Sequence, residues 1–440
     1  MSWRWALAGV AIAVFLVGGA GLGYYLYIQG KSADIRGSST VEFVPTEAPP
    51  TTVPTPPQRP NPVTHKPAAL TRVDWPTFGF DARRVRYLPS GLAPPFRVVW
   101  TFHGRHLLEF PPVIAYGRAY IANNPGVLFA VQAATGRTSW RYTSGRCAAA
   151  SPAVAGELVY MAFLNLRRKG RDACNAAPST PGLDGEVVAL DARTGRVRWH
   201  RRIGASETSP LVANGRVYVG DWRGDVYALD AKTGRVFWSY RTGGQVKGAL
   251  TLSGRRLYVG SYDHNLYALT AGTERLIWKA SSQDRLGGRG TFYSTPAAAY
   301  GRVYIGSTDG KVYSFGATSG RVRWSQSTHG YVYGSPAIWN RLVLVGSYSK
   351  RFFALDAATG DVVWQFEANG PISGSATVLG NIVYFSTLAG RTYGLDAKTG
   401  KQIWSFPDGK YSPVVAGPDR VFLVGYTKMY GLVPARVARQ

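Results

Sequence analysis

The chain has 440 residues and a formal net charge of +26 at pH 7. Its 52 glycines and 27 prolines, with few stretches of helical periodicity, are not those of a helical protein and favour an all-β chain rich in turns. The charge indicates anionic partners such as phospholipid headgroups or cell-wall polymers, unless the arginines are spread evenly over the surface.

The first element is an apolar stretch from Trp5 to Ile28. It has 24 residues and no charge. As a helix it would rise about 36 Å, against a hydrocarbon core of about 30 Å. We therefore expect residues 1–30 to form one transmembrane anchor, with a cleaved signal peptide as the alternative. Arg4 before the stretch and Lys31 and Arg36 after it do not settle the orientation by charge.

The next element is a proline-rich stretch. Nine of the 23 residues from Pro45 to Pro67 are proline, with polar residues between them, so no core can form there. In polyproline form it would extend roughly 70 Å. We expect residues 31–73 to be a flexible linker that holds a folded domain off the bilayer.

The rest of the chain is a repeat, whose clearest copy is VYALDAKTGRVFW at Val226 to Trp238. Asp230 can accept backbone N–H groups and Gly234 can take positive φ, so the copy predicts a hairpin. Its tryptophan recurs at gaps of 40, 59, 39, 40, 46, 40 and 40 residues. Eight copies of such a unit predict a closed array with one shared core, and therefore one large domain. The tryptophans are Trp100, Trp140, Trp199, Trp238, Trp278, Trp324, Trp364 and Trp404.

We expect residues 74–440 to form this eight-bladed β-propeller. A lead-in segment from Asp74 to Tyr87 precedes the first β run, Phe96 to Phe102. At the other end, Tyr411 to Leu432 supplies three β runs without a signature tryptophan. The simplest closure makes Phe96 to Phe102 the outer strand of that last blade, which removes an exposed edge.

The two cysteines test this layout. In an up-and-down blade, the turns between the second and third strands lie on the same face as the crossovers between blades. Cys147 lies in the crossover that enters the second blade, and Cys174 lies in an insertion at residues 165–185 between its second and third strands. A disulfide between them is therefore expected, and indicates an oxidising compartment. Two free thiols in a cytosolic protein are the alternative.

The blade motif has the form A-x-D-x-x-T-G-x-x-x-W at Ala189 to Trp199, Ala228 to Trp238 and Ala354 to Trp364. Gly394 replaces the alanine in the copy that ends at Trp404. With this motif, residues 74–432 resemble the PQQ-repeat family of eight-bladed propellers. The motif supports the fold more than any activity.

The resemblance implies one of two kinds of protein. The family contains quinone-dependent dehydrogenases and non-catalytic relatives, such as the outer-membrane assembly lipoprotein of Gram-negative bacteria and sensor domains of bacterial kinases. The dehydrogenases place a pair of adjacent cysteines against the cofactor and use a Ca²⁺ site and an aspartate base. Cys147 and Cys174 are not adjacent. We therefore expect closer kinship with the non-catalytic members and no cofactor, with PQQ and calcium as the alternative.

The expected ligand surface is the face that carries the crossovers. Nine residues in these segments could supply hydrogen bonds and stacking to a small polar or peptide ligand, or they could merely line a water-filled funnel. No metal site is expected, because His103-x-x-His106 lacks a third ligand. The nine are Glu207, Thr208, Gln245, Lys247, Arg289, Tyr293, Tyr331, Tyr333 and Tyr411.

The leading hypothesis is a single-pass protein of the cell membrane with its propeller on the extracytoplasmic side. It would bind envelope proteins or anionic cell-surface components as a scaffold, without catalysing a reaction. A PQQ-dependent oxidoreductase is the first alternative, and a ligand-sensing domain that works with a separate kinase is the second. Export would separate the domain from chromosome and RNA, so no nucleic-acid partner is expected. The sequence indicates no particular oligomeric state.

Overall fold

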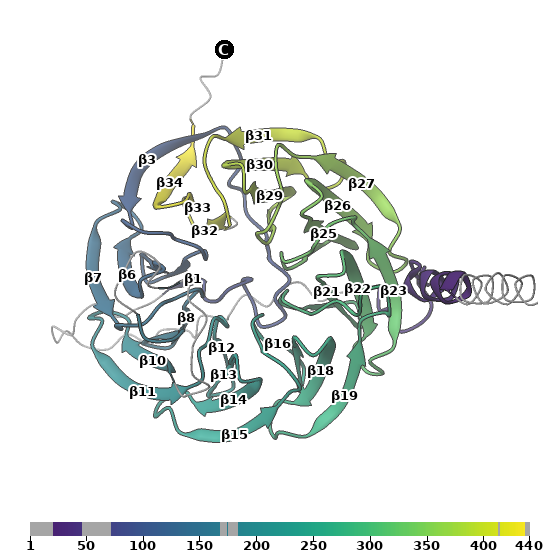
Figure 1. The fold of residues 1–440 in the computed structure, drawn as a ribbon. Helices are drawn as coiled ribbons and strands as arrows, with labels where there is room; N and C mark the ends of the chain where they lie inside the picture. Colours follow the sequence, from purple (N-terminus) through teal and green to yellow (C-terminus); the bar gives the residue numbers. More distant parts are fainter. Residues whose placement is uncertain (1–20, 46–71, 168–173, 175–183, 412–413, 436–440) are drawn as a thin grey trace, which may run out of the picture.

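The computed structural model describes residues 21–45, 72–167, 174, 184–411 and 414–435. In these residues the strands form eight sheets around a central axis, as Figure 1 shows. Seven sheets contain four sequential strands of one blade, and the eighth combines strands from the two ends of the domain. The predicted all-β, eight-bladed propeller is confirmed.

The blades follow one another along the chain, each from its inner to its outer strand. The first two blades contain β4 (Val113–Ala115), β5 (Arg118–Ala122), β6 (Val127–Gln132) and β7 (Thr138–Thr143), then β8 (Ala153–Ala155), β9 (Leu158–Phe163), β10 (Gly185–Asp191) and β11 (Val197–Ile203). The third and fourth contain β12 (Leu211–Ala213), β13 (Arg216–Gly220), β14 (Asp225–Asp230) and β15 (Val236–Arg241), then β16 (Thr251–Ser253), β17 (Arg256–Gly260), β18 (Asn265–Thr270) and β19 (Leu276–Ser281).

The remaining blades continue in the same order. The fifth and sixth contain β20 (Ala297–Ala299), β21 (Arg302–Gly306), β22 (Lys311–Gly316) and β23 (Val322–Ser327), then β24 (Ala337–Trp339), β25 (Leu342–Gly346), β26 (Arg351–Asp356) and β27 (Val362–Glu367). The seventh and eighth contain β28 (Thr377–Leu379), β29 (Ile382–Thr387), β30 (Arg391–Asp396) and β31 (Gln402–Phe406), then β32 (Val415–Ala416), β33 (Val421–Val424) and β34 (Lys428–Pro434).

The turn between the third and outer strands explains the repeated motif. In the third blade, Asp230 Oδ1 accepts the backbone N–H of Lys232 at 3.0 Å and of Thr233 at 2.8 Å. Gly234 has a φ of 69°, and a Cβ there would lie 2.5 Å from the ring of Trp199 in the preceding blade. Glycine therefore serves both the turn and the close approach of a tryptophan.

The signature tryptophans join neighbouring blades. Six of them donate their indole N–H to a carbonyl of the following blade at 2.9 to 3.2 Å. Trp238 differs, because its Nε1 is buried without a partner. The equivalent carbonyl, that of Ala271, accepts from Tyr218 Oη at 2.9 Å, as the same carbonyl does from a tyrosine in other blades, and also from Arg216 Nη1 at 3.2 Å. The carbonyl of Ala271 belongs to the fourth blade, whose turn before the outer strand has Glu274 in place of the motif glycine.

The ring closes as the sequence predicts. Strand β3 (Phe96–His103) pairs antiparallel with β34, from Phe96 opposite Pro434 to His103 opposite Lys428. It thereby becomes the outer strand of the eighth blade. The ring of Phe96 also lies edge-on to that of Trp404, with centroids 5.5 Å apart, which seals the junction with the seventh blade.

Residues 73–88, here called the hub segment, run around the inside of the ring. They begin with β1 (Val73–Trp75), antiparallel to β4, and end with β2 (Tyr87–Leu88), parallel to β28. Between these strands, Thr77 Oγ1 donates to the carbonyl of Pro210 in front of β12. Backbone carbonyls of the hub segment also accept N–H groups from β8, β16, β20, β24 and β28 at 2.7 to 2.9 Å. The segment thus bonds to seven blades, which the sequence did not predict.

Two arginines of the hub segment are buried at the centre. Arg84 is 0% exposed and Arg86 is 1% exposed. Arg84 is satisfied by neutral acceptors: the carbonyl oxygens of Leu250, Phe78, Ser209 and Pro210 and the hydroxyl of Thr77. Arg86 instead lies over the ring of Phe78, 4.2 Å from its centroid. Arg84 therefore ties together the third and fourth blades and the hub segment itself.

Residues 33–45, here called the N-terminal strap, lie against the fifth and sixth blades. Ile35 forms an antiparallel bridge with Ser325 on β23, and Gly37 N donates to the carbonyl of Thr359. Farther along, Glu42 forms an ion pair with Arg323. Sequence composition placed residues 31–73 in a flexible linker. The strap makes ordered contacts because it lies before the proline-rich stretch, which begins at Pro45.

A short helix precedes the strap at residues 21–32 and projects from the ring beside β23 in Figure 1. No helix in the described part of the chain is both long and apolar enough to span a bilayer. The predicted span from Trp5 to Ile28 lies largely in residues 1–20, and the proline-rich stretch largely in residues 46–71. Both of these ranges are outside the described residues.

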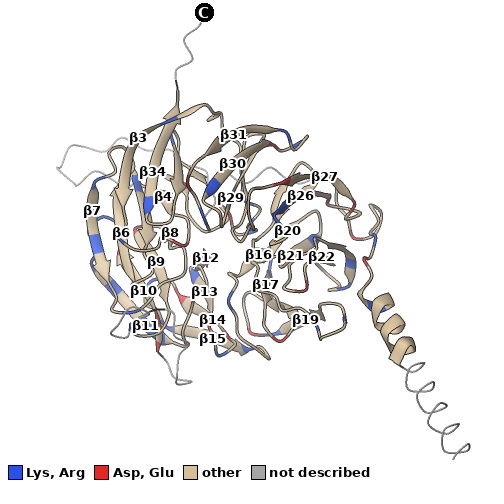
Figure 2. Ribbon diagram, turned by 45° about the horizontal axis from the view of Figure 1, so that its top comes forward, with Lys and Arg blue, Asp and Glu red and all other residues tan. Residues whose placement is uncertain are grey.

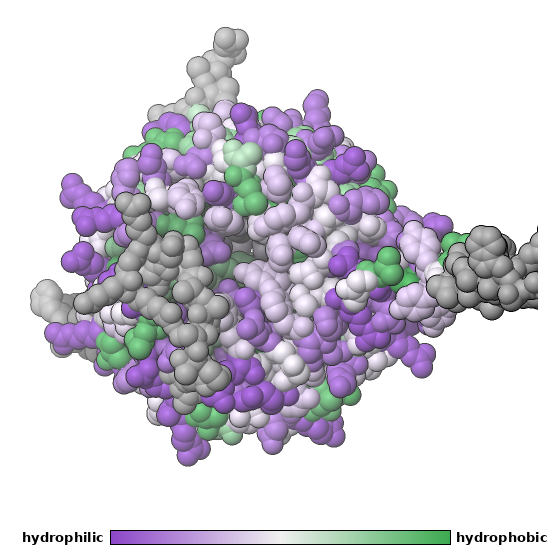
Figure 3. All heavy atoms as spheres, viewed as in Figure 1, coloured by the Kyte–Doolittle hydropathy of each residue, from purple (hydrophilic) through white to green (hydrophobic). Residues whose placement is uncertain are grey.

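The basic side chains of the described residues are spread over the surface of the ring. Figure 2 shows lysine and arginine on blades all around the ring. The face seen in Figure 3 is mainly hydrophilic, with small and separate hydrophobic areas. In the part of the chain that the structure describes, the basic residues are therefore spread over the blades of the repeat.

Candidate functional site

A small cavity lies on the ring axis and is called the funnel here. Its walls are the segments that precede the inner strands, which the crossovers between blades deliver to one face. Phe78 from the hub segment lines it as well. The topology therefore gathers side chains from far apart in the sequence around one space, as propellers do at their axis.

A buried ion pair forms one wall of the funnel. Lys247 Nζ lies 3.2 Å from Glu207 Oε1, and the two side chains are 17% and 9% exposed. The indole N–H of Trp222 donates to the same carboxylate at 2.9 Å. Burial raises the pKa of Glu207, and Lys247 opposes that shift. The Lys247 ammonium therefore helps to keep the buried Glu207 carboxyl ionised.

Aromatic rings surround the lysine. Its Nζ lies 4.2 Å from the ring centroid of Trp222 and 5.1 Å from that of Tyr262. Tyr293 follows at 6.0 Å and packs edge-on against Tyr333, with centroids 5.2 Å apart. Burial, with Glu207 beside it, raises the pKa of Tyr293 well above its usual value, so its hydroxyl stays a hydrogen-bond donor.

Glu109 is a second carboxylate in the funnel. It lies in the loop between β3 and β4 and is followed by Phe110 and Pro111, which also line the cavity. Burial and then the neighbouring Glu207 charge raise its pKa to about 7. Among the described residues that line the funnel, two carboxylates therefore share the space with one ammonium group.

Five of the nine predicted ligand residues line the funnel: Glu207, Lys247, Tyr293, Tyr333 and Tyr411. Tyr331 is 49% exposed and packs against Tyr333 outside the lining. The remaining three have other roles. Thr208 is buried and bonds to the backbone of Gly220, the carbonyl of Gln245 accepts the N–H of Tyr262, and Arg289 pairs with Asp284 at the surface.

Glu109 and Phe110 were missed by sequence reasoning. A usable signal existed, because they precede the inner strand of the first blade, just as Glu207 precedes that of the third. Trp222 and Tyr262 were also missed, since they belong to turns between second and third strands. Their rings reach Lys247 because that turn lies on the same face as the crossovers.

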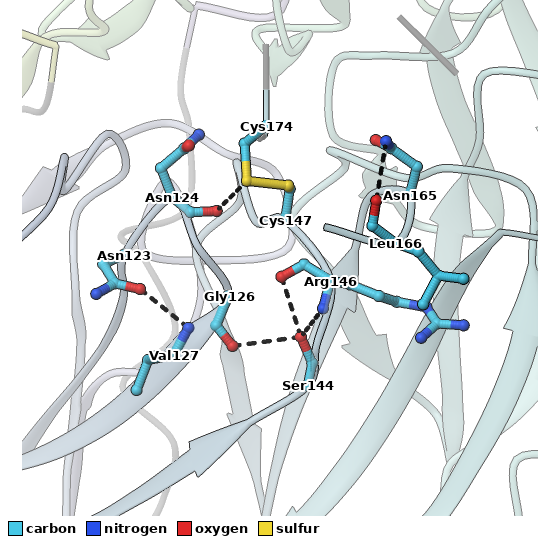
Figure 4. The surroundings of a disulfide bond; sticks show 10 residues. All are labelled: Asn123, Asn124, Gly126, Val127, Ser144, Arg146, Cys147, Asn165, Leu166 and Cys174. Atoms are coloured by element: carbon cyan, nitrogen blue, oxygen red, sulfur yellow. Dashed lines mark hydrogen bonds between the residues drawn. A yellow bond between two sulfur atoms is a disulfide. The ribbon is translucent and has the colours of Figure 1, made fainter. Parts of the chain in front are cut away.

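The predicted disulfide joins Cys147 to Cys174, as Figure 4 shows. The crossover and the insertion run side by side at this point. Cys147 N donates to the carbonyl of Asn165 at 3.0 Å, and Leu164 N donates to the carbonyl of Cys147 at 2.9 Å. Both loops therefore lie on the face predicted from the order of the strands.

Within the described ranges, no three side chains of His, Cys, Asp or Glu gather in a way that could hold a metal ion. The disulfide joins residues 27 apart in sequence. It is therefore not a pair of adjacent cysteines of the kind that the dehydrogenase resemblance implies.

These features define an eight-bladed propeller built from PQQ-like blades, with a funnel formed by its crossovers. A family model described as outer membrane protein assembly factor BamB matches residues 93–171, 183–331 and 331–436. The chain belongs to this family.

Solved structures and curated relatives resemble it more distantly. BamB from Moraxella catarrhalis has a TM-score of 0.62 at 17% identity, over 77% of this chain and 99% of that one. Quinohemoprotein alcohol dehydrogenase from Comamonas testosteroni has a TM-score of 0.67 at 17% identity, over 85% and 82%. Both likenesses show the fold alone. The 1-butanol dehydrogenase (cytochrome c) of Thauera butanivorans is 25% identical over 162 residues, which cover 34% of this chain and 22% of that protein. The chain spans about a fifth of the length of the curated relatives it matches.

Proposed function

We propose that this chain is a membrane-anchored, extracytoplasmic propeller that acts as a non-catalytic interaction scaffold. The N-terminal strap is the observation that carries the proposal. Its hydrogen bonds and ion pair join residues 33–45 to two blades. The strap therefore couples the ring to the preceding helix, and through that helix to the medium in which the helix is embedded. The apolar sequence from Trp5 to Ile28 is long enough to make that medium a bilayer.

The strap also gives the scaffold an orientation. Gln283 Nε2 donates to the carbonyls of Lys31 and Ala33 at 3.1 and 2.9 Å, and Lys311 pairs with Asp34 at 2.9 Å. Gln283 lies in a crossover and Lys311 begins β22, so both are at the funnel face. The anchor in this proposal therefore joins the ring at the edge of that face.

The disulfide supports an extracytoplasmic compartment, because disulfides are typical of proteins outside the cytoplasm. Export would bring envelope proteins and anionic cell-surface components within reach as partners and would remove nucleic acid from reach. The basic residues are spread over the blades, so the net charge of +26 does not by itself select among these partners. Crosslinking in intact envelopes is the direct search for such a partner, and finding none across several crosslinkers would count against a scaffold.

A reporter fused after Gln440 tests the location. We expect alkaline phosphatase at this position to be active and green fluorescent protein to be dark, because the C-terminus would be exported. A matched chain without residues 1–30 should reverse both readings. Active fluorescent protein on the full chain would place the propeller in the cytoplasm and overturn the proposal.

A PQQ-dependent oxidoreductase is the second candidate, favoured by the dehydrogenase relatives and by a cavity at the ring axis. The residues present fit that cofactor poorly. PQQ is a polycarboxylate, whereas the funnel offers Glu109 and Glu207 against one lysine that is already paired. The described residues also supply no cluster for calcium. We therefore derive no reaction step through this cofactor.

Reconstitution tests the second candidate. Purified chain mixed with PQQ and Ca²⁺ should show no change in the quinone spectrum and no dye reduction with primary alcohols. A quinoprotein alcohol dehydrogenase reconstituted in parallel is the positive control. Alcohol-dependent dye reduction by this chain would show that it is an enzyme and would overturn the proposal of a non-catalytic scaffold.

A further inference from the structure

The fifth blade holds a peptide segment on the face opposite the funnel, where the turns between first and second strands lie. The segment is the N-terminal strap. Arg302, the first residue of β21, donates from Nε to the carbonyl of Glu42 at 3.1 Å and from Nη2 to the carbonyl of Val41 at 2.8 Å. Arg323 on β23 pairs with the Glu42 carboxylate. Two blade arginines therefore bind both the backbone and the acidic side chain of one short segment.

The fourth blade, next to the fifth in Figure 1, has an arginine at the equivalent position. Arg256 is the first residue of β17 and pairs with Thr270 on β18, just as Arg302 pairs with Gly316 on β22. Its Nε corresponds to the Nε of Arg302 that binds the strap, and is buried without a partner among the described residues. A surface pocket lies at this place. It is lined by Arg255, Arg256, Thr270, Arg275 and Ile277.

The pocket lacks the carboxylate that the repeat places there in other blades. Four blades have the motif aspartate in the position of Thr270, and in the second blade this aspartate pairs with Arg198 at 2.7 Å. Glu274 is next to Arg275 in the turn but does not line the pocket. Among the described residues that line it, three guanidinium groups therefore meet no acid, which favours an anionic ligand. The four aspartates are Asp191, Asp230, Asp356 and Asp396.

We propose that this pocket binds a short acidic segment of a partner protein, with a carboxylate among the guanidinium groups of Arg255, Arg256 and Arg275. The inference rests on the proposed interaction role and gives the partner a chemistry. The geometry of the strap is not copied in full. A Cβ at Gly316 would clash with Glu42 Oε2, so the threonine in the fourth blade keeps a carboxylate farther from the sheet. Residues 46–71 of this chain contain one acidic and two basic residues, so their charge does not suit the pocket.

Peptides with blocked ends test this chemistry on the full chain in detergent. Hexaglutamate carries the carboxylates, and hexaglutamine has the same length without charge. Fluorescence anisotropy of labelled peptides at low ionic strength should show hexaglutamate binding at least about tenfold more tightly, and added salt should weaken it. Equal binding of the two peptides would overturn the proposal. Inorganic tripolyphosphate is the competitor: if it displaces labelled hexaglutamate at a lower concentration than unlabelled hexaglutamate does, the pocket is one for phosphate groups and the proposal is wrong.

Two double variants with the same change of net charge locate the site. Arg256→Gln with Arg275→Gln should weaken hexaglutamate binding at least about tenfold, because it removes two of the three guanidinium groups. Arg137→Gln with Arg196→Gln removes two exposed arginines from the corresponding turns of the first and second blades, and should weaken binding by about twofold at most. Equal losses in the two variants would show that only the net charge attracts the peptide, and would contradict the assignment.

A substitution at Thr270 provides a readout that keeps every arginine. Thr270→Asp restores the motif aspartate, whose carboxylate should pair with the arginines and weaken hexaglutamate binding about tenfold. Thr270→Asn has nearly the same size without the charge and should bind like the unmodified chain. An aspartate variant that binds hexaglutamate unchanged would contradict the pocket as the site. None of these measurements depends on the compartment, so the reporter fusion can fail while peptide binding stands, and the reverse.

Discussion

Replacing Arg84 by leucine is expected to lower the free energy of unfolding by about 4 kcal/mol or more. The side chain is fully buried and donates to five acceptors, four of which are backbone carbonyls. Leucine can satisfy none of them, and each buried carbonyl left without a donor costs about 1 to 3 kcal/mol. Urea unfolding followed by tryptophan fluorescence measures the loss.

One further variant separates the hydrogen bonds of Arg84 from its charge, and a second, at an exposed arginine, is the control. Arg84→Lys keeps the charge but lacks the planar set of donors, so it should lose a large part of the same stability. Arg196→Leu removes an exposed arginine from a turn and should change stability by about 0.5 kcal/mol at most. A leucine variant as stable as the original chain would show that the hub segment does not hold the blades together.

Replacing Lys247 by methionine is expected to destabilise the chain by about 3 to 5 kcal/mol at pH 8. Methionine leaves Glu207 buried with only neutral donors such as the Trp222 indole N–H. The pKa of Glu207, already raised by burial, should rise further once Lys247 no longer lowers it. A carboxyl with a raised pKa in the folded state favours folding in acid. The penalty should therefore be small below pH 4.5 and grow as pH rises through the folded pKa.

The double variant Glu207→Gln with Lys247→Met is the matched control. It removes both charges and keeps an amide oxygen that can accept from Trp222. We expect it to recover most of the lost stability and to lose the added pH dependence, because a buried pair can be replaced by neutral groups at little cost. Unfolding curves at pH 5 and pH 8 give both quantities. A double variant as unstable as Lys247→Met would show that packing of the lysine chain, and not its charge, is what matters.

The blades and their closure could be predicted because they follow a repeat. Val226 to Trp238 carries its own turn chemistry, and the missing tryptophan after Tyr411 identified β3 as the last outer strand. The alternating direction of the strands in each blade also placed the loops of Cys147 and Cys174 on one face. These inferences depend on order along the chain, which a sequence displays directly.

The hub segment and the N-terminal strap could not be predicted in the same way. The hub segment bonds mainly through backbone carbonyls, and such bonds leave no periodic pattern of side chains. The strap was not predicted because the composition of residues 31–73 as a whole is dominated by the prolines from Pro45 onward. Each occurs once, so no second copy revealed it.

The candidate site was only half predictable. Choosing residues before inner strands found Glu207 and Lys247, because every crossover leads to the axis. The same rule could not tell that Thr208 turns toward Gly220, since neighbouring residues of an extended segment point in opposite directions. It also omitted Glu109, which lies in the crossover from β3, the outer strand of the eighth blade, to β4, the inner strand of the first.

The hub segment and β3 have a consequence for how the chain is made. Both are synthesised before any complete blade, yet their partners lie throughout the domain, and β3 pairs with β34 at its far end. Contacts of such long sequence separation form slowly. During synthesis the earliest part of the domain must wait, with its pairing edges open, until the ribosome has released the last strand. Until then these unpaired edges are exposed to pairing with other chains, which favours aggregation.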